Sequence, residues 1–343
     1  MDIMMKGGLA LLFFYFLGCS TSEQLSGWSG MTMGTTYQVK IVQKSPAAND
    51  LDELKSIVDS ALTEVNHQMS TYDPASEIAR FNQFRDTTAF RVSTGFVTVV
   101  KEALEIYESS GKAFDITVAP LVNLWGFGVT GDRIVPPAQT KISSILKNVG
   151  SKYLLTESDH FLKKKIPELQ VDLSAIAKGY GVDVVTGVLR KKHYDNFMVE
   201  IGGEVYASGN KTNGELWKIG IDSPNLHSLP GQKIQAILSL KNIAVATSGD
   251  YRNYFEYNGK LYSHTIDPKS GYPVTHNLAS VTVIARNCMQ ADALATAIMV
   301  MGKERGMDYI EKIDNAEAYF ISRKSSETYE TAQSSGFKQY LNE

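Results

Sequence analysis

Apolar residues recur at helical spacing in four stretches of the chain. The first predicted helix begins near Asp50, where Asp50 and Glu53 form the pattern of a capping box. Three further helices are predicted over residues 96–107, 174–191 and 289–301, each with apolar positions three or four residues apart. The pattern therefore predicts long helices in both halves of the chain.

Short runs of β-branched and aromatic residues dominate the second half. Strands are predicted over residues 36–42, 196–207, 217–221, 235–240, 243–247, 254–264 and 279–284. Asn258-Gly259 is typical of a type I′ hairpin turn. Because strands and helices interleave without strict alternation, we predict an α+β fold of mixed sheets flanked by helices, as one domain over residues 30–343.

The N-terminus has the pattern of an export signal. Residues 9–17 form an apolar run after Lys6 that is too short to span a bilayer. The run ends where a small residue precedes Cys19, as in a lipobox. An ordinary cleaved signal peptide with a chance cysteine is the alternative, but the place of Cys19 at the end of the run favours a lipoprotein. We predict a signal peptide over residues 1–18, lipidation at Cys19 and a polar tether over residues 19–29.

Composition and charge narrow the class of protein. The chain has 343 residues, of which 43% are hydrophobic and 21% charged, as expected of a folded protein with a sizeable core. The net charge of −3 and the absence of a long Lys/Arg run exclude a nucleic-acid-binding protein. There are two cysteines, so lipidation of Cys19 would leave Cys288 without a disulfide partner in the chain. We interpret Cys288 as a core residue.

Gly126, Gly128 and Gly131 match the G-x-G-x-x-G pattern of dinucleotide-binding proteins. That motif requires a strand before it and a helix after it. Here Pro136 and Pro137 follow closely, and proline is incompatible with a helix interior. We therefore interpret these glycines as loop residues and reject a Rossmann fold.

The segment around Asp172 offers an anion site. A helix is expected to begin at about Ser174, and the free N–H groups of a helix N-terminus favour an anion. Lys178 lies one turn further and would reach a phosphate or a ring. A plain capped helix with an exposed lysine explains the same residues as well.

Two later segments carry further polar groups. The loop with Ser248, Gly249 and Arg252 offers a hydroxyl, a glycine and a guanidinium to a phosphate. Asp292 and Thr296 are four residues apart on a helix, so their oxygens share one face. A carboxylate on an apolar face is costly unless it is paired or binds a metal, and oxygen ligands favour Mg²⁺ over Zn²⁺. The alternative is that Asp292 caps the start of the helix.

The order of the short motifs is more specific than any one of them. They are Met-Gly-Thr at 33–35, Ser-Thr-Tyr at 70–72, Ala-Phe-Asp-Ile-Thr at 113–117, Val-Asp-Leu-Ser-Ala-Ile-Ala-Lys-Gly at 171–179, Glu-Ile-Gly-Gly-Glu at 200–204, Thr-Ser-Gly-Asp-Tyr at 247–251, Ser-His-Thr-Ile-Asp-Pro at 263–268 and Ala-Asp-Ala-Leu-Ala-Thr-Ala at 291–297. This series resembles the ApbE family of FAD:protein FMN transferases, from about Met31 to Gly302.

The resemblance implies the residues of a site. Flavin contacts are expected at Met33, Tyr72, Ala113, Phe114, Asp115, Asp172, Lys178 and Ile266. A metal is expected on the side chains of Asp292 and Thr296 and the backbone oxygen of Ala175, with Ala295 in the same turn. His264 matches a histidine for which a catalytic role has been considered.

The chemistry of these residue types agrees with the resemblance. A pyrophosphate carries negative charge, which Mg²⁺ on Asp292 and Thr296, the helix start and Arg252 would neutralise. His264, near its ordinary pKa of about 6.5, would act as base toward a hydroxyl. Tyr72 with Met33 would form an aromatic and thioether wall for a flavin ring.

The resemblance also implies an activity. It is Mg²⁺-dependent transfer of FMN from FAD to a Ser or Thr hydroxyl of a target protein, with release of AMP, by a flavin transferase domain over residues 30–343. The expected acceptor is a subunit of a membrane redox complex, such as a sodium-pumping NADH:quinone oxidoreductase. The expected place is the periplasmic side of a bacterial membrane, anchored through Cys19. Two alternatives stay open: a Mg²⁺-dependent FAD pyrophosphatase that yields FMN and AMP, and a non-enzymatic FAD-binding lipoprotein.

Overall fold

The computed structural model describes residues 23–44, 51–129, 131, 135–225, 229, 231–251, 253–325 and 328–342. The predicted signal peptide, Cys19 and Arg252 lie outside the described residues. Within the described part of the chain, no helix is both long and apolar enough to cross a bilayer.

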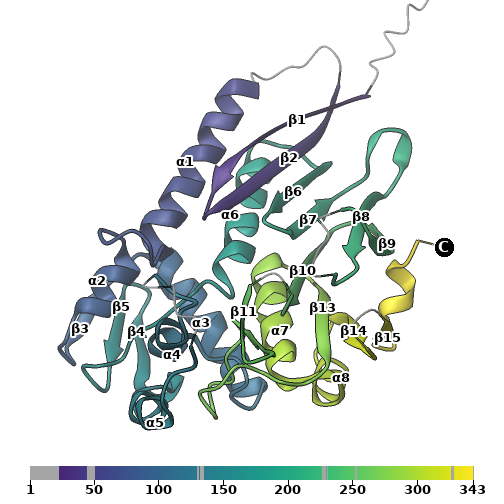
Figure 1. Ribbon diagram of the computed structural model, residues 1–343. Helices are drawn as coiled ribbons and strands as arrows, with labels where there is room; N and C mark the ends of the chain where they lie inside the picture. Colours follow the sequence, from purple (N-terminus) through teal and green to yellow (C-terminus); the bar gives the residue numbers. More distant parts are fainter. Residues whose placement is uncertain are drawn as a thin grey trace, which may run out of the picture.

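An eight-stranded sheet with the order β1-β2-β6-β7-β10-β13-β14-β15 forms the centre of the molecule (Figure 1). Each neighbouring pair in it is antiparallel. Its strands are β1 (Glu23–Thr32), β2 (Thr35–Lys44), β6 (Phe197–Ile201), β7 (Glu204–Ser208), β10 (Ile243–Gly249), β13 (Leu278–Ala285), β14 (Glu317–Arg323) and β15 (Tyr329–Gln333).

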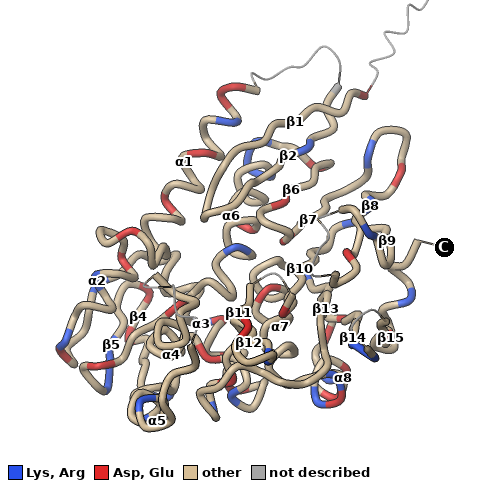
Figure 2. The backbone as a smooth tube through the Cα atoms, viewed as in Figure 1, with Lys and Arg blue, Asp and Glu red and all other residues tan. Residues whose placement is uncertain are grey.

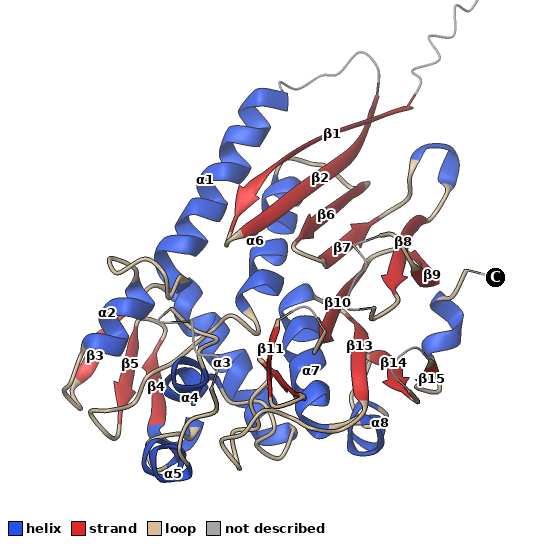
Figure 3. Ribbon diagram, viewed as in Figure 1, coloured by secondary structure: helices blue, strands red, loops and turns tan. Residues whose placement is uncertain are grey.

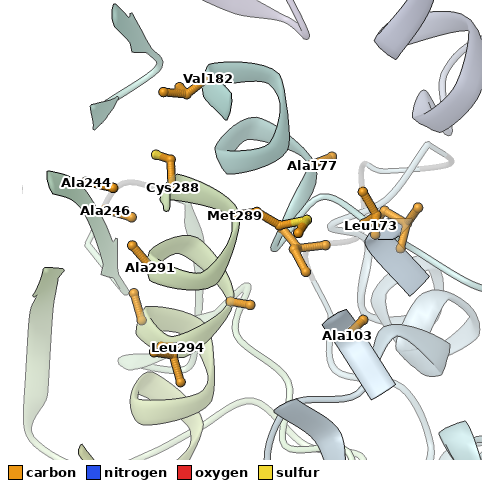
Figure 4. Packing of buried hydrophobic residues seen from close by; sticks show 14 of the residues in the cluster. Ala103, Leu173, Ala177, Val182, Ala244, Ala246, Cys288, Met289, Ala291 and Leu294 are labelled. Atoms are coloured by element: carbon orange, nitrogen blue, oxygen red, sulfur yellow. The ribbon is translucent and has the colours of Figure 1, made fainter. Parts of the chain in front are cut away.

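Helices pack against this sheet and against one another. They are the long helices α1 (Leu51–Met69), α3 (Thr94–Ser109), α6 (Ala177–Lys191) and α7 (Cys288–Met301) and the short helix α8 (Lys303–Ile310). Helix α6 packs on β6 and β7, and α7 packs on β10 and β13. Small side chains, such as Ala244 and Ala246 of β10 and Ala291 of α7, lie where helix and sheet meet (Figure 4). Small residues permit this close approach, so α7 is buried on nearly all sides.

A second, smaller layer lies on the other side of the central sheet. It consists of β8 (Trp217–Asp222) and β9 (Ile234–Leu240), which form a separate antiparallel pair. Trp217 is buried among apolar residues of the central sheet, and its indole N–H donates to Ser208 O at 2.9 Å.

The remaining elements form a part of the molecule that lies at the left of Figure 3, around a three-stranded sheet with the order β3-β5-β4. They are β3 (Ala89–Arg91), β4 (Leu154–Ser158), β5 (Phe161–Lys164), α2 (Glu77–Gln83), α4 (Ala119–Trp125) and α5 (Gln139–Leu146). The 3-10 turns η1 (Ile116–Val118) and η2 (Ser151–Tyr153) directly precede α4 and β4. Elsewhere lie the hairpin β11 (Tyr254–Tyr257) with β12 (Lys260–Ser263) and the 3-10 turns η3 (Thr212–Gly214) and η4 (Phe337–Tyr340).

The predicted α+β fold with flanking helices is confirmed, and so are the four predicted helices, with small shifts at their ends. The type I′ turn is confirmed by positive φ angles of 51° at Asn258 and 71° at Gly259. Gly126 ends α4 with φ 85°, so the glycine pattern follows a helix instead of preceding one. The rejection of a Rossmann fold is therefore correct.

Three local predictions need correction. The predicted tether extends into β1, because Glu23–Thr32 pairs with β2 along its whole length. The predicted strand 196–207 is two strands, since Gly202 and Gly203 turn the chain with φ 60° and 106°. The helix predicted from Ser174 begins at Ala177, after a turn.

Candidate active site

Thirteen of the predicted site residues line one cavity of about 980 Å³. The cavity walls come from α2, α4, the start of α6, β10 and α7, which are far apart in the sequence. The predicted residues in the walls are Tyr72, Ala113, Phe114, Asp115, Asp172, Ala175, Lys178, Ser248, Gly249, His264, Ile266, Asp292 and Thr296. The fold therefore brings most of the separate motifs to one place.

Asp292 lies in the wall of this cavity and is only 4% exposed. Helix α7 is capped by Asn287, whose side chain accepts a hydrogen bond from Gln290 N–H, so the interpretation of Asp292 as a cap is wrong. Its Oδ2 accepts instead from Gly179 N–H at 3.0 Å, at the start of α6. The carboxylate thus joins the two helices at the cavity wall.

Lys178 forms ion pairs with two buried carboxylates. Its Nζ lies 2.9 Å from Glu204 Oε1 and 3.8 Å from Asp292 Oδ1. Burial lowers the pKa of Lys178, but the two carboxylates outweigh it and raise the pKa above its ordinary value. Burial also raises the pKa of Asp292, and it raises the pKa of Glu204 to about 7. Lys178 is therefore a paired ammonium in the cavity wall, not a free surface lysine.

Glu204 received no role in the sequence analysis, although it lies in one of the motifs. It is the first residue of β7, all of whose residues are buried. Its second oxygen, Oε2, has no hydrogen-bond partner. The sequence could have indicated a role for Glu204, because it is a lone acidic residue beside apolar strand residues and a buried carboxylate requires a counter-charge.

Oxygen atoms suited to a hard cation lie along the same wall. Ser248 and Thr296 share a hydrogen bond of 3.2 Å between their hydroxyls. The Gly179 N–H that would ordinarily bond to Ala175 O donates to Asp292 instead, and Ala175 also lines the cavity. The described residues hold no group of three His, Cys, Asp or Glu side chains arranged for a metal. One carboxylate with hydroxyl and carbonyl oxygens is nevertheless a donor set that fits Mg²⁺ with bound waters.

The ring of His264 lines the cavity and is held by one backbone contact. Its Nδ1 lies 3.0 Å from the carbonyl oxygen of Asn253. Because a carbonyl can only accept, Nδ1 carries the proton, and Nε2 of the neutral ring keeps its lone pair. Burial lowers the pKa of His264, and Lys178 adds to this, while the Asn253 carbonyl and Asp250 oppose it. The neutral imidazole is the form of a general base.

The acidic residues at the flavin positions are held by the protein itself. Asp115 accepts four hydrogen bonds, from the N–H and hydroxyl groups of Thr117 and Ser151. Asp172 accepts from the N–H and the hydroxyl of Ser174. Both carboxylates therefore shape loops at the cavity wall.

Apolar and aromatic residues line another part of the cavity. Tyr72 is 71% exposed, whereas Phe114 and Ile266 are buried. Phe127 also lines the cavity and meets the His264 ring edge-on at 6.3 Å between centroids. These groups offer both a face and an edge to a planar ring.

Among the predicted site residues that the structure describes, Met33 and Ala295 are not in the cavity wall. Met33 lies in the turn between β1 and β2 with φ 50°, and its sulfur faces Gly181 of α6. The contact of Met33 with a flavin ring stays a prediction. Ala295 is fully buried in the core, because on α7 the positions four residues apart, Asp292 and Thr296, are those that face the cavity.

The model of the ApbE family matches residues 33–320. The chain belongs to the ApbE family. It is similar to the FAD:protein FMN transferase of Vibrio cholerae serotype O1, with 44% identity over 324 residues, which cover 94% of this chain and 95% of that protein. It is 38% identical to the FAD:protein FMN transferase of Haemophilus influenzae over 325 residues, 93% of this chain and 92% of that protein.

Solved structures of ApbE proteins have the same architecture. The flavin transferase ApbE from Vibrio cholerae superposes with a TM-score of 0.84 at 43% identity and covers 93% of this chain and 100% of its own. The apo form of the flavinyl transferase ApbE from Pseudomonas stutzeri gives a TM-score of 0.84 at 36% identity, covering 93% and 97%. The fold of this ApbE chain is therefore that of flavin transferases.

Proposed function

We propose that this chain is an FAD:protein FMN transferase that needs Mg²⁺ and moves FMN from FAD to a Ser or Thr hydroxyl of an acceptor protein, with release of AMP. The names of its relatives support the class of reaction. The observation that carries the proposal is that one cavity holds both His264, with Nε2 available as a base, and the buried oxygen donors around Asp292.

Different residues of the cavity would bind the metal and the flavin ring. Asp292, Thr296 and the backbone oxygen of Ala175 would hold Mg²⁺, which when bound would neutralise negative charge on the phosphate oxygens of FAD. Tyr72, Phe114 and Phe127 would bind the flavin ring, and their apolar surface would keep water from it.

His264 would supply the proton acceptor. Nε2 takes the proton of the acceptor hydroxyl as its oxygen attacks the phosphorus on the riboflavin side of FAD. A new phosphoester bond forms, the bond between that phosphorus and the bridging oxygen breaks, and AMP leaves with the bridging oxygen. If water takes the place of the acceptor hydroxyl, the same steps yield free FMN and AMP.

Mass spectrometry of an acceptor fragment tests this proposal. The protein is incubated with FAD, Mg²⁺ and a fragment of a membrane redox subunit that contains the acceptor Ser or Thr, with and without EDTA. The expected result is an FMN-sized mass gain on that Ser or Thr which EDTA abolishes. Metal-dependent AMP and FMN without a mass gain would identify a pyrophosphatase instead. FAD binding without either product would identify a carrier.

We further propose that the protein acts on the periplasmic side of a bacterial membrane, anchored through a lipid on Cys19, near an acceptor subunit of a membrane redox complex. The apolar run over residues 9–17 that ends at Cys19 supports this. Cell fractionation and lipid labelling are the tests. We expect the wild-type protein to carry lipid and to be found in the membrane fraction, and the Cys19→Ser variant to carry no lipid. Equal lipid labelling of the two proteins would contradict the proposal.

A further inference from the structure

A partly buried ion pair involves Asp250, three residues before Asn253, whose carbonyl oxygen holds His264. Arg323, the last residue of β14, donates two hydrogen bonds to Asp250, from Nη1 to Oδ2 at 2.7 Å and from Nη2 to Oδ1 at 2.5 Å. The two side chains are 25% and 15% exposed. A bidentate pair of this kind fixes direction as well as distance, because the guanidinium and the carboxylate are both planar.

Both partners of the pair are held by the backbone of the central sheet. Arg323 N–H donates to Asn277 O at 2.8 Å, and Asp250 N–H donates to Ala279 O at 3.1 Å. Asp250 directly follows β10, Asn277 directly precedes β13, and Ala279 is the second residue of β13. The pair therefore ties the chain that leaves β10 to the rigid sheet.

The chain from Asp250 leads within three residues to the carbonyl that holds His264. Asn253 O accepts two hydrogen bonds from His264, from its backbone N–H at 3.1 Å and from Nδ1 at 3.0 Å. Between them, Tyr251 is buried, and its ring lies so close to Gly249 that a Cβ at Gly249 would be 2.6 Å from it. Tyr251, next to Asp250, is thus packed against the end of β10.

We propose that Arg323 is a positioning residue for His264: by clamping Asp250 it holds the Asn253 carbonyl where it keeps Nδ1 protonated and Nε2 directed into the cavity. The proposal rests on the proposed function, in which His264 is the base. The other groups that act on the His264 ring are the ring of Phe127 and the charges of Asp250 and Lys178. Of these, only Asp250 is bound by Arg323.

Two variants of Arg323 remove its bidentate contact with Asp250 in different ways. Arg323→Lys keeps the positive charge but cannot make the bidentate contact, and Arg323→Met removes both. Lys303→Met is the matched control, because it breaks an ion pair of 2.7 Å with Glu330 on the neighbouring strand and leaves Asp250 untouched. We expect both Arg323 variants to lower kcat for FMN transfer by about 10- to 100-fold with little change in the KM for FAD, and the control to keep the wild-type rate.

The second measurement does not depend on activity. Nitrogen NMR of the histidine rings reports which ring nitrogen carries the proton, and the chain has six histidines, so His264 is assigned by its absence in His264→Ala. We expect wild type and Lys303→Met to show the Nδ1–H form, and both Arg323 variants to show a mixture of the two forms.

The combined outcomes are distinguishable. An Nδ1–H signal in the folded Arg323 variants equal to that of wild type overturns the positioning role, whatever their rate. A change of form confined to the Arg323 variants supports it. If that change is seen while wild type transfers no FMN, the positioning role stands and the proposed function fails.

Discussion

Asp292 is the residue on which the proposed metal site depends most. Its carboxylate is buried, bonded to Gly179 N–H, and close to a single ammonium that is shared with Glu204. We expect Asp292→Ala to lower AMP release from FAD by about 100-fold or more, because the carboxylate of the proposed metal site is lost. Circular dichroism and the melting temperature check that the fold is kept. A variant that stays folded and fully active would remove Asp292 from the metal site.

The environment of His264 predicts how the rate of FMN transfer depends on pH. The pKa of its ring is lowered, chiefly by burial, so a lower pH is needed to protonate Nε2. We expect the rate of FMN transfer to stay level from pH 8 to about 6.5 and to fall only below that. His264→Ala should bind FAD but transfer FMN about 100-fold more slowly or worse. If the variant keeps the same acid limb in its pH–rate profile, that limb belongs to another group.

At the scale of elements, the crossing of α6 and α7 positions the site. A Cβ on Gly179 would lie 2.3 Å from the backbone oxygen of Cys288, so the two helices meet without side chains between them. We expect Gly179→Ala to lower the free energy of unfolding by about 1–3 kcal/mol and to weaken the bond to Asp292. Gly187→Ala is the control on the same helix, because its Cβ would meet nothing within 4 Å.

For Gly187→Ala we expect no loss of stability and a gain of up to about 1 kcal/mol, since alanine favours the helix. Urea unfolding of both variants at one pH measures the difference. Equal stability of the two would show that the helices can separate at little cost and that the crossing is not tightly packed.

At the scale of the whole molecule, we expect stability to depend on pH through Asp183, a half-buried acid between two helices. Asp183 of α6 accepts hydrogen bonds from the N–H groups of Cys288 and Met289 at 2.9 Å each, at the start of α7. Burial raises its pKa from 3.8 to about 6. The folded state therefore binds this proton at a higher pH than the unfolded state does.

Because the pKa of Asp183 is higher in the folded state than in the unfolded state, protonation of Asp183 stabilises the fold. The contribution of Asp183 to stability is complete below about pH 4 and is lost as the pH rises through about 6. We expect wild type to gain about 1 kcal/mol relative to Asp183→Asn between pH 7.5 and pH 5, measured by urea unfolding at both values. A pH response that is the same in the two proteins would show that Asp183 does not titrate in this range.

Charged residues lie on most elements of the described structure, as Figure 2 shows. Along α1 acidic residues outnumber lysine, whereas acidic and basic residues alternate along α8. The charges in unusual surroundings lie inside the molecule: Glu204 and Asp292 are buried at the cavity beside the half-buried Lys178, and Lys164 is fully buried with its Nζ donating to Phe84 O at 2.8 Å. The cavity therefore contains a cluster of paired charges that differs from the charged surface of the helices.

Local sequence alone determined the features that depend on neighbours in the chain. The apolar stripe of α1 and the turn at Asn258-Gly259 are set by spacing and by backbone preference, which act over a few residues. The burial of Cys288 also followed, since it lies between apolar runs and is fully buried in the structure. The order of motifs was enough to identify the family, because it samples almost the whole chain.

Tertiary structure decided what depends on residues far apart. Glu23–Thr32 has few apolar residues and becomes a strand because β2 offers its hydrogen bonds. Met33 was expected in the site, but the turn directs it to Gly181. The pairing of Lys178 with Glu204 and of Arg323 with Asp250 joins positions 26 and 73 residues apart. Burial and counter-charge act through space, and no spacing along the chain encodes them.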